Sequence, residues 1–157
     1  MKIFNQGAHP ECKWYWFLSA LAILNPNIDS EAVISAINED EAGLLTNRKA
    51  GEFFKSRWFI KDYEEVPRLK AKALLNRGIP LIANIIGVDW ENTGKAPYIA
   101  VFDGRIAAHN CTIVGYDNNT RILDVANTWG DQWGDKGHYY LKADDLDKVT
   151  SFCRIIV

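Results

Sequence analysis

The sequence predicts an α+β fold in a single domain, with a helical half over about residues 1–77 and a β half over about 78–157. Apolar residues recur at helical spacing in the first half, and short apolar runs separated by turn residues follow in the second. Helices that precede strands in this way are typical of α+β domains. A chain of 157 residues with 48% hydrophobic residues is large enough to form one packed core.

The helical half begins with its most apolar segment. Residues 12–24 are apolar on nearly every face, which predicts a buried central helix, and Asn25-Pro26-Asn27 ends it. Pro10 and Glu11 suit the first turn of that helix. Further helices are expected after a cap at Asp29 or Ser30, over residues 48–58, and over residues 68–76.

The β half shows a series of strand-like segments. Turn residues such as Asp117-Asn118-Asn119 separate them, which indicates an antiparallel sheet or a partial barrel. The expected strands cover residues 79–87, 98–102, 107–116, 121–126, 138–142 and 151–157.

The charge and the motifs exclude several classes of partner. The formal net charge is −2 and no basic stripe is present, so we expect neither nucleic acid nor an anionic membrane as the main partner. The apolar stretch 14–24 is too short to span a bilayer. No group of histidines and cysteines has zinc-ligand spacing, so we expect no metal and no cofactor.

The N-terminus and the cysteines indicate a reducing compartment. Residues 1–7 contain no long apolar run, so they do not resemble a signal peptide, and we expect an intracellular, cytoplasmic protein. The size suggests a bacterial or phage source. Of the 3 cysteines, Cys111 and Cys153 both lie in strand-like segments, and a disulfide between them is left open, as is the oligomeric state.

Four residues have the chemistry that a cysteine nucleophile requires. Cys12 lies near a helix N-terminus, where the dipole lowers the pKa of a thiol. His109 and Asn127 lie in or after neighbouring strands, and an asparagine oxygen can accept from the imidazole and fix its tautomer. Gln6 lies on an Asn-Gln-Gly turn, and its amide and the Cys12 backbone N–H would form a two-donor oxyanion hole.

These segments resemble the papain family of cysteine peptidases. Asn5-Gln6-Gly7 followed by Cys12 resembles the family's oxyanion glutamine and nucleophile, and His109 with Val114-Gly115-Tyr116 resembles its histidine strand. The segment 127–139, Asn-Thr-Trp-Gly-Asp-Gln-Trp-Gly-Asp-Lys-Gly-His-Tyr, resembles the family's Asn-Ser-Trp-Gly-x-x-Trp-Gly-x-x-Gly-Tyr. The resemblance covers residues 5–24 and about 78–141.

The resemblance implies a papain-like fold with an active-site cleft between the two halves. It implies a peptidase that hydrolyses peptide bonds of a peptide or protein substrate through Cys12, His109 and Asn127, with Gln6 in the oxyanion hole. For the cleft it implies Ala108, just before the histidine, and Trp129, which would cover the bond between His109 and Asn127.

The nucleophile segment departs from the family pattern and leaves alternatives open. His9 stands where the family usually has a second cysteine, and Lys13 where it usually has tryptophan. Residues 16–20, Trp-Phe-Leu-Ser-Ala, can be aligned with the family's Trp-Ala-Phe-Ser-Ala, which puts Tyr15 in place of the nucleophile and predicts an inactive homologue that binds a peptide. We favour the gapless alignment, with Cys12 as nucleophile. A Cys–His amidase or isopeptidase that acts on a non-standard amide is the other alternative.

Overall fold

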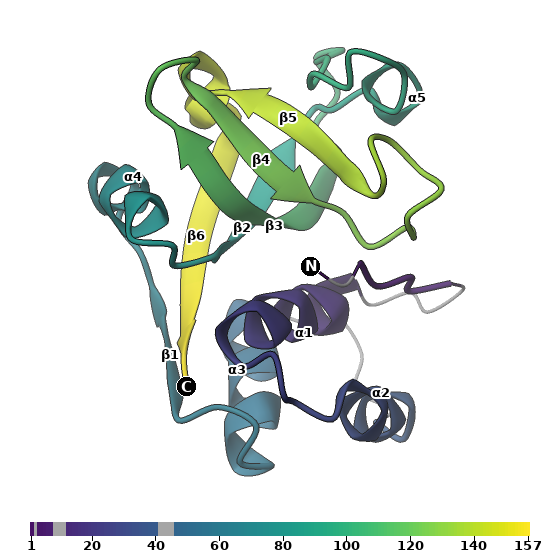
Figure 1. The fold of residues 1–157 in the computed structure, drawn as a ribbon, viewed down its shortest axis with the longest axis vertical. Helices are drawn as coiled ribbons and strands as arrows, with labels where there is room; N and C mark the ends of the chain where they lie inside the picture. Colours follow the sequence, from purple (N-terminus) through teal and green to yellow (C-terminus); the bar gives the residue numbers. More distant parts are fainter. Residues whose placement is uncertain (2, 8–11, 41–45) are drawn as a thin grey trace.

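The computed structural model describes residues 1, 3–7, 12–40 and 46–157, and of Cys12 and Lys13 it describes the backbone alone. Three helices lie together at one end of the molecule and a sheet lies at the other (Figure 1). The helices are α1 (Cys12–Leu24), α2 (Ser30–Asn38) and α3 (Asn47–Ser56). The predicted order of helices first and strands later is confirmed, and the architecture is α+β.

Helix α1 forms the centre of the helical core. Trp16, Phe17 and Leu18 have no exposed surface, which explains why this helix is apolar on nearly every face. Asp29 caps α2 as predicted, because its carboxylate accepts from the backbone N–H groups of Glu31 and Ala32. The predicted roles of His9, Pro10 and Glu11 lie outside the described residues.

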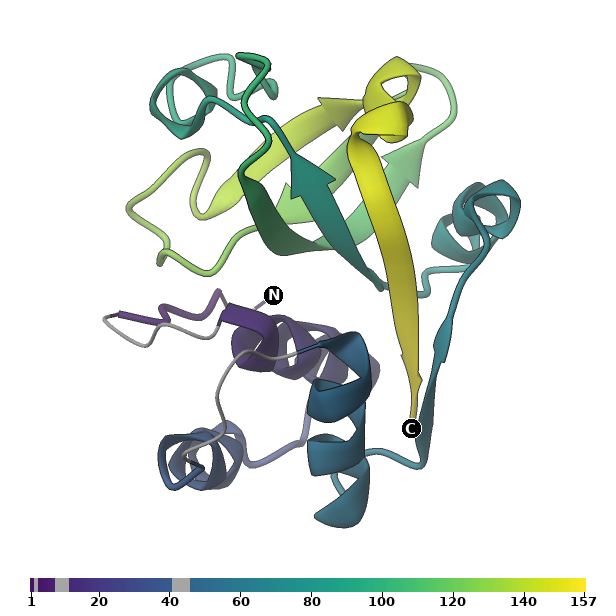
Figure 2. The same ribbon diagram turned by 180° about the vertical axis from the view of Figure 1, so that it is seen from behind.

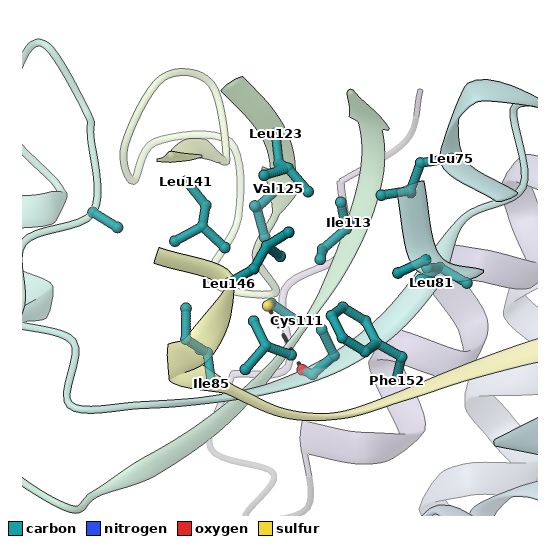
Figure 3. Packing of buried hydrophobic residues seen from close by; sticks show 14 of the residues in the cluster. Leu75, Leu81, Ile85, Cys111, Ile113, Leu123, Val125, Leu141, Leu146 and Phe152 are labelled. Carbon is teal, nitrogen blue, oxygen red and sulfur yellow. Dashed lines mark hydrogen bonds between the residues drawn. The ribbon is translucent and has the colours of Figure 1, made fainter. Parts of the chain in front are cut away.

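The sheet has six strands in the order β1-β6-β2-β3-β4-β5, and each neighbouring pair is antiparallel. One face of this sheet carries a second core, closed by α4 (Arg68–Asn76) (Figure 3). The strands are β1 (Asp62–Glu65), β2 (Leu81–Ile86), β3 (Ala108–Asp117), β4 (Ile122–Ala126), β5 (His138–Lys142) and β6 (Val149–Ile156).

The expected strand over residues 98–102 is wrong. This segment makes single bridges, from Ile99 to Tyr140 and from Phe102 to Val88, and belongs to no ladder. Its first residue, Tyr98, has a φ of 63°, which is left-handed and incompatible with a continuous extended strand. The short helix α5 (Trp90–Thr93) and the 3₁₀ helix η1 (Ala143–Lys148) were not expected from the sequence.

Two separate cores divide the chain earlier than residue 77. The helical core contains residues from Phe4 to Ile60 together with Ile82, Cys153 and Ile155 of the sheet. Val66, Ala71 and Leu75 pack in the core on the other face of the sheet. The segment from Val66 through α4, expected in the helical half, therefore packs with the sheet, whereas Tyr63 of β1 packs against the helical core.

Cys111 and Cys153 are separate thiols and not a disulfide. Cys111 pairs in register with Ala83 and Cys153 with Ile82, which are adjacent residues of β2. Because successive residues of a strand point to opposite faces, the two sulfurs lie on opposite sides of the sheet. The sheet geometry thus answers the question that the sequence left open.

Candidate active site

The antiparallel pairing of β3 and β4 brings His109 and Asn127 together. Thr112 of β3 pairs with Ala126 of β4, so the beginning of one strand lies beside the end of the other. His109 is the second residue of β3, and Asn127 directly follows β4. The result is a contact of 2.9 Å between His109 Nε2 and Asn127 Oδ1.

A backbone hydrogen bond fixes the orientation of the Asn127 amide. The N–H of Thr128 donates to Asn127 Oδ1 at 2.9 Å. Because a backbone N–H can only donate, the amide atom that it meets must be the oxygen. Because Oδ1 can only accept, the proton in the contact with His109 must lie on Nε2. Nδ1 of the neutral imidazole then carries the lone pair, as a general base requires.

Three indole rings surround the His109 imidazole. The centroid of the ring lies 4.8 Å from that of Trp129, 4.9 Å from that of Trp90 and 5.2 Å from that of Trp16. The Trp129 ring is tilted by only 35° from the imidazole plane, whereas the other two meet it edge-on. These rings come from a loop, from α5 and from α1, so all three parts of the chain must pack correctly to enclose the histidine.

The burial of His109 changes its titration. Loss of solvent lowers the pKa of the imidazole from its usual 6.5 to about 4, and the hydrogen bond that the ring donates to Asn127 opposes that shift. The histidine is therefore neutral at pH 7 in this surrounding.

The N-terminal segment is joined to the loop that contains Asn127. The Gln6 backbone N–H donates to the Thr128 carbonyl at 2.8 Å, and Asn5 bridges to Trp129. The Thr128 hydroxyl also donates to Gln6 Oε1 at 2.6 Å, which fixes the end of the amide that carries oxygen. These bonds hold Gln6 beside the residue that follows Asn127.

The cleft residues expected from the sequence lie at the same end of β3. Ala108 begins the strand and is exposed, and the neighbouring His109 is partly buried. Trp129 contacts the His109 ring directly. The sequence did not single out Trp16 or Trp90 as neighbours of the histidine.

Cys12 is the first residue of α1, but its side chain lies outside the part of the chain that the structure describes. Trp16 lies one helical turn later and so shares a face of α1 with Cys12. Tyr15 is buried in the helical core, and its burial raises the pKa of the phenol above the usual value.

The remaining cysteines are unsuited to nucleophilic chemistry. Cys111 is buried among the apolar residues of the sheet core, and burial raises the pKa of its thiol to about 12 (Figure 3). Cys153 is buried in the helical core. Within the described ranges, no group of three or more histidine, cysteine and acidic residues is placed to hold a metal ion. No helix in those ranges is long and apolar enough to cross a membrane.

Comparison with protein families gives one match that covers most of the chain. The model described as papain family cysteine protease matches residues 46–155, a range that ends well after Asn127 and begins after Cys12. A probable cysteine protease of Arabidopsis thaliana, RD21B, is 31% identical over 160 residues, which cover 97% of this chain and 32% of that protein. Mouse cathepsin F is 31% identical over 90 residues, 53% of this chain and 20% of its own length. The chain thus spans about a third or less of the length of these curated relatives.

Solved structures of cysteine proteases share the fold. Xylellain from Xylella fastidiosa superposes with a TM-score of 0.73 at 14% identity, covering 100% of this chain and 83% of that chain. Bromelain from Ananas comosus superposes with a TM-score of 0.63 at 16% identity, and the match covers 100% of this chain and 94% of the bromelain chain. With this fold, and with the family match over residues 46–155, the chain belongs to the papain family of cysteine proteases.

Proposed function

We propose that the protein is a cysteine-dependent peptidase in which Cys12 is the nucleophile, His109 the base and Asn127 the residue that orients the base. The observation that carries the proposal is the 2.9 Å bond between His109 Nε2 and Asn127 Oδ1. Because the Thr128 N–H fixes the amide oxygen, that bond selects the tautomer whose Nδ1 can take a proton. Membership of a cysteine protease family supports peptide or protein substrates.

The geometry of α1 supports Cys12 over Tyr15 as the nucleophile. Trp16 meets the His109 ring, and Cys12 lies one turn earlier on the same helical face. Tyr15 lies about a quarter of a turn from Trp16 around the helix axis and so does not share that face. The start of a helix also favours a thiolate, because the backbone N–H groups of the first turn are unpaired and partly positive.

The proposed reaction has two stages. Cys12 Sγ transfers its proton to His109 Nδ1 and attacks the carbonyl carbon of the scissile peptide bond. The oxyanion of the tetrahedral intermediate is held by the Cys12 backbone N–H and the Gln6 side-chain amide. The C–N bond then breaks, the amine leaves with the proton from His109, and a thioester remains on Cys12. Water attacks that thioester, its proton passes to His109 and then to the thiolate, and a carboxylic acid is released.

The environment of His109 keeps its imidazole neutral. A pKa lowered to about 4 leaves the ring unprotonated at pH 7, and because such a low pKa also makes Nδ1 a weak proton acceptor, the thiolate formed at Cys12 must stabilise the imidazolium during the reaction. The surrounding indoles also limit the access of water to the bond with Asn127.

An inactive, peptide-binding homologue is the competing function. The observation in its favour is that the family match covers residues 46–155 and leaves out the segment with Cys12. A protein of this kind would keep the cleft but would not form a covalent adduct.

A thiol-directed epoxide probe with mass spectrometry distinguishes the two functions. We expect a single adduct on Cys12, lost in His109→Ala because the thiol then has no base. The buried Cys111 and Cys153 act as internal controls that stay unmodified in the folded protein. An unmodified Cys12 in a protein with an intact fold would exclude the peptidase. An adduct on Cys12 without cleavage of peptides, but with cleavage of isopeptide or other non-standard amide bonds, would favour the amidase alternative.

A further inference from the structure

The C-terminal end of α3 contains a residue in a costly conformation. The N–H of Trp58 donates to the Lys55 carbonyl at 3.1 Å, and the N–H of Phe59 donates to the Phe54 carbonyl at 3.0 Å. This pair of bonds closes the helix in a Schellman motif, whose left-handed residue is usually glycine. Here that residue is Trp58, with a φ of 60°. An aromatic residue in this conformation is strained, so helix termination alone does not account for the tryptophan.

The Trp58 side chain is also 91% exposed, the largest aromatic surface that the described residues present to solvent. The next residues turn inward: Phe59 is half-buried and Ile60 is buried. The indole stands at the rim of a cavity of about 630 Å³ that Phe59, Ile60, Asn25 and Lys61 also line. The molecule therefore presents a projecting apolar group directly beside a hollow whose wall combines apolar residues with polar and charged ones.

This surface lies away from the candidate active site. In both views the end of α3 and the end of β6 lie toward one end of the long axis, whereas the end of β4 and the start of α1 lie near its middle (Figures 1 and 2). Val157, after β6, is another residue of the cavity wall. A partner bound here would leave the segment around His109 accessible.

The charges around the cavity are balanced. Lys55 is paired with Asp62 at 3.3 Å, and Glu52 accepts from the Tyr63 hydroxyl at 2.9 Å. Lys61 forms no ion pair with any residue that the structure describes, and neither does Glu52. Besides the Lys55–Asp62 pair and the C-terminal residue Val157, the cavity wall thus carries one cation and one anion, Lys61 and Glu52, each available to an opposite charge.

We propose that this surface binds a second copy of the chain across a two-fold axis, with each Trp58 entering the cavity of the other copy. A two-fold interface needs a surface that is complementary to itself. The surface around Trp58 has a projecting indole beside a cavity, so two copies can be complementary in shape. It also has Lys61 near Glu52, so Lys61 of one copy can pair with Glu52 of the other and the two copies can be complementary in charge. Buried tryptophans are among the residues that contribute most to such interfaces.

Sedimentation equilibrium from low micromolar to near-millimolar protein tests the proposal without reference to catalysis. We expect a monomer–dimer equilibrium whose dissociation constant rises roughly thirtyfold or more in Trp58→Gly. That variant removes the indole and suits the backbone at this position, so a thermal melt should show an intact fold. Leu69→Ala is the matched control, because Leu69 is 97% exposed on α4 and lines no wall of this cavity.

A charge exchange tests the two-fold geometry. Lys61→Glu should weaken the dimer, because position 61 of one copy then repels Glu52 of the other. The double variant Glu52→Lys, Lys61→Glu should restore the dimer, because positions 61 and 52 then carry opposite charges again. A protein that stays monomeric at every concentration would overturn the proposal. So would a dimer that Trp58→Gly leaves unchanged, or one that Leu69→Ala weakens equally.

Discussion

The Nε2 atom of His109 lies 2.9 Å from Oδ1 of Asn127, and the same oxygen accepts from the Thr128 N–H at 2.9 Å. One backbone donor thus decides which nitrogen of the histidine holds the proton. Because Asn127 is only 1% exposed, water cannot readily replace either bond.

Substitution of Asn127 tests how much this orientation contributes to catalysis. We expect Asn127→Ala to lower kcat/KM by roughly 10–100-fold, less than His109→Ala, because the base remains but its ring can rotate. Asn110→Ala is the matched control, because Asn110 is also buried in this region but bonds to Asn84 and not to His109. Equal losses of activity in the two asparagine variants would contradict the assignment.

The stability of the protein should depend on pH through His109. The folded pKa of about 4 lies below the usual 6.5, so the neutral ring stabilises the fold above pH 6.5 and this stability is lost as the pH falls toward 4. The size of the shift corresponds to about 3 kcal/mol in the free energy of unfolding. Urea denaturation of Cys12→Ser and of Cys12→Ser, His109→Gln at several pH values isolates this contribution. If the two curves run parallel between pH 6.5 and 4, the histidine is not buried as the structure indicates.

Two tryptophans of the same helix provide a matched pair for the enclosure of His109. The ring centroid of Trp16 lies 5.2 Å from that of the His109 imidazole. Trp14 is equally buried, but its ring centroid lies 4.2 Å from that of Phe53. Both Trp→Phe variants should cost roughly 1–2 kcal/mol of stability because each leaves a cavity. Only Trp16→Phe should raise the pKa of His109, measured from the ring protons by NMR, because it lets solvent approach the ring. An equal shift in Trp14→Phe would show a general loosening of the fold.

Relief of the left-handed Trp58 should increase stability. A non-glycine residue in the left-handed conformation lowers the free energy of unfolding by roughly 1–2 kcal/mol. Replacement by glycine removes this strain, but it also increases the entropy of the unfolded chain, which offsets part of the stabilisation. We expect Trp58→Gly to raise the free energy of unfolding of the monomer by roughly 0.5–1 kcal/mol, measured at low protein concentration. A clear loss of stability would mean that the indole has a packing role that its 91% exposure does not indicate.

The parts of the fold that depend on local pattern were predictable. The α4 helix has the predicted bounds of 68–76, and β5 those of 138–142, because apolar periodicity and turn residues define both segments. The pairing of β1 with β6 was not predictable, because Asp62–Glu65 is short and acidic and has no strand-like pattern of its own. Only a contact between residues far apart in the chain makes this segment a strand.

In the candidate site, too, some residues could be predicted from a local motif, whereas others are brought together only by packing. His109 and Asn127 stand in a long motif and could be paired from the sequence, whereas nothing in the sequence places Trp90 of α5 against the imidazole. Trp16 could have been suspected from its spacing of one turn from Cys12, but only the packing of α1 on β3 brings it to His109.

Hydrolysis of a fluorogenic peptide library by the unmodified protein, Cys12→Ser and Tyr15→Phe tests the proposed mechanism most directly. We predict cleavage by the unmodified protein and by Tyr15→Phe, and its loss in Cys12→Ser, because only the Cys12 thiol forms the acyl intermediate. Cleavage that persists in Cys12→Ser, or a folded protein that cleaves no peptide, would contradict a Cys12–His109–Asn127 peptidase.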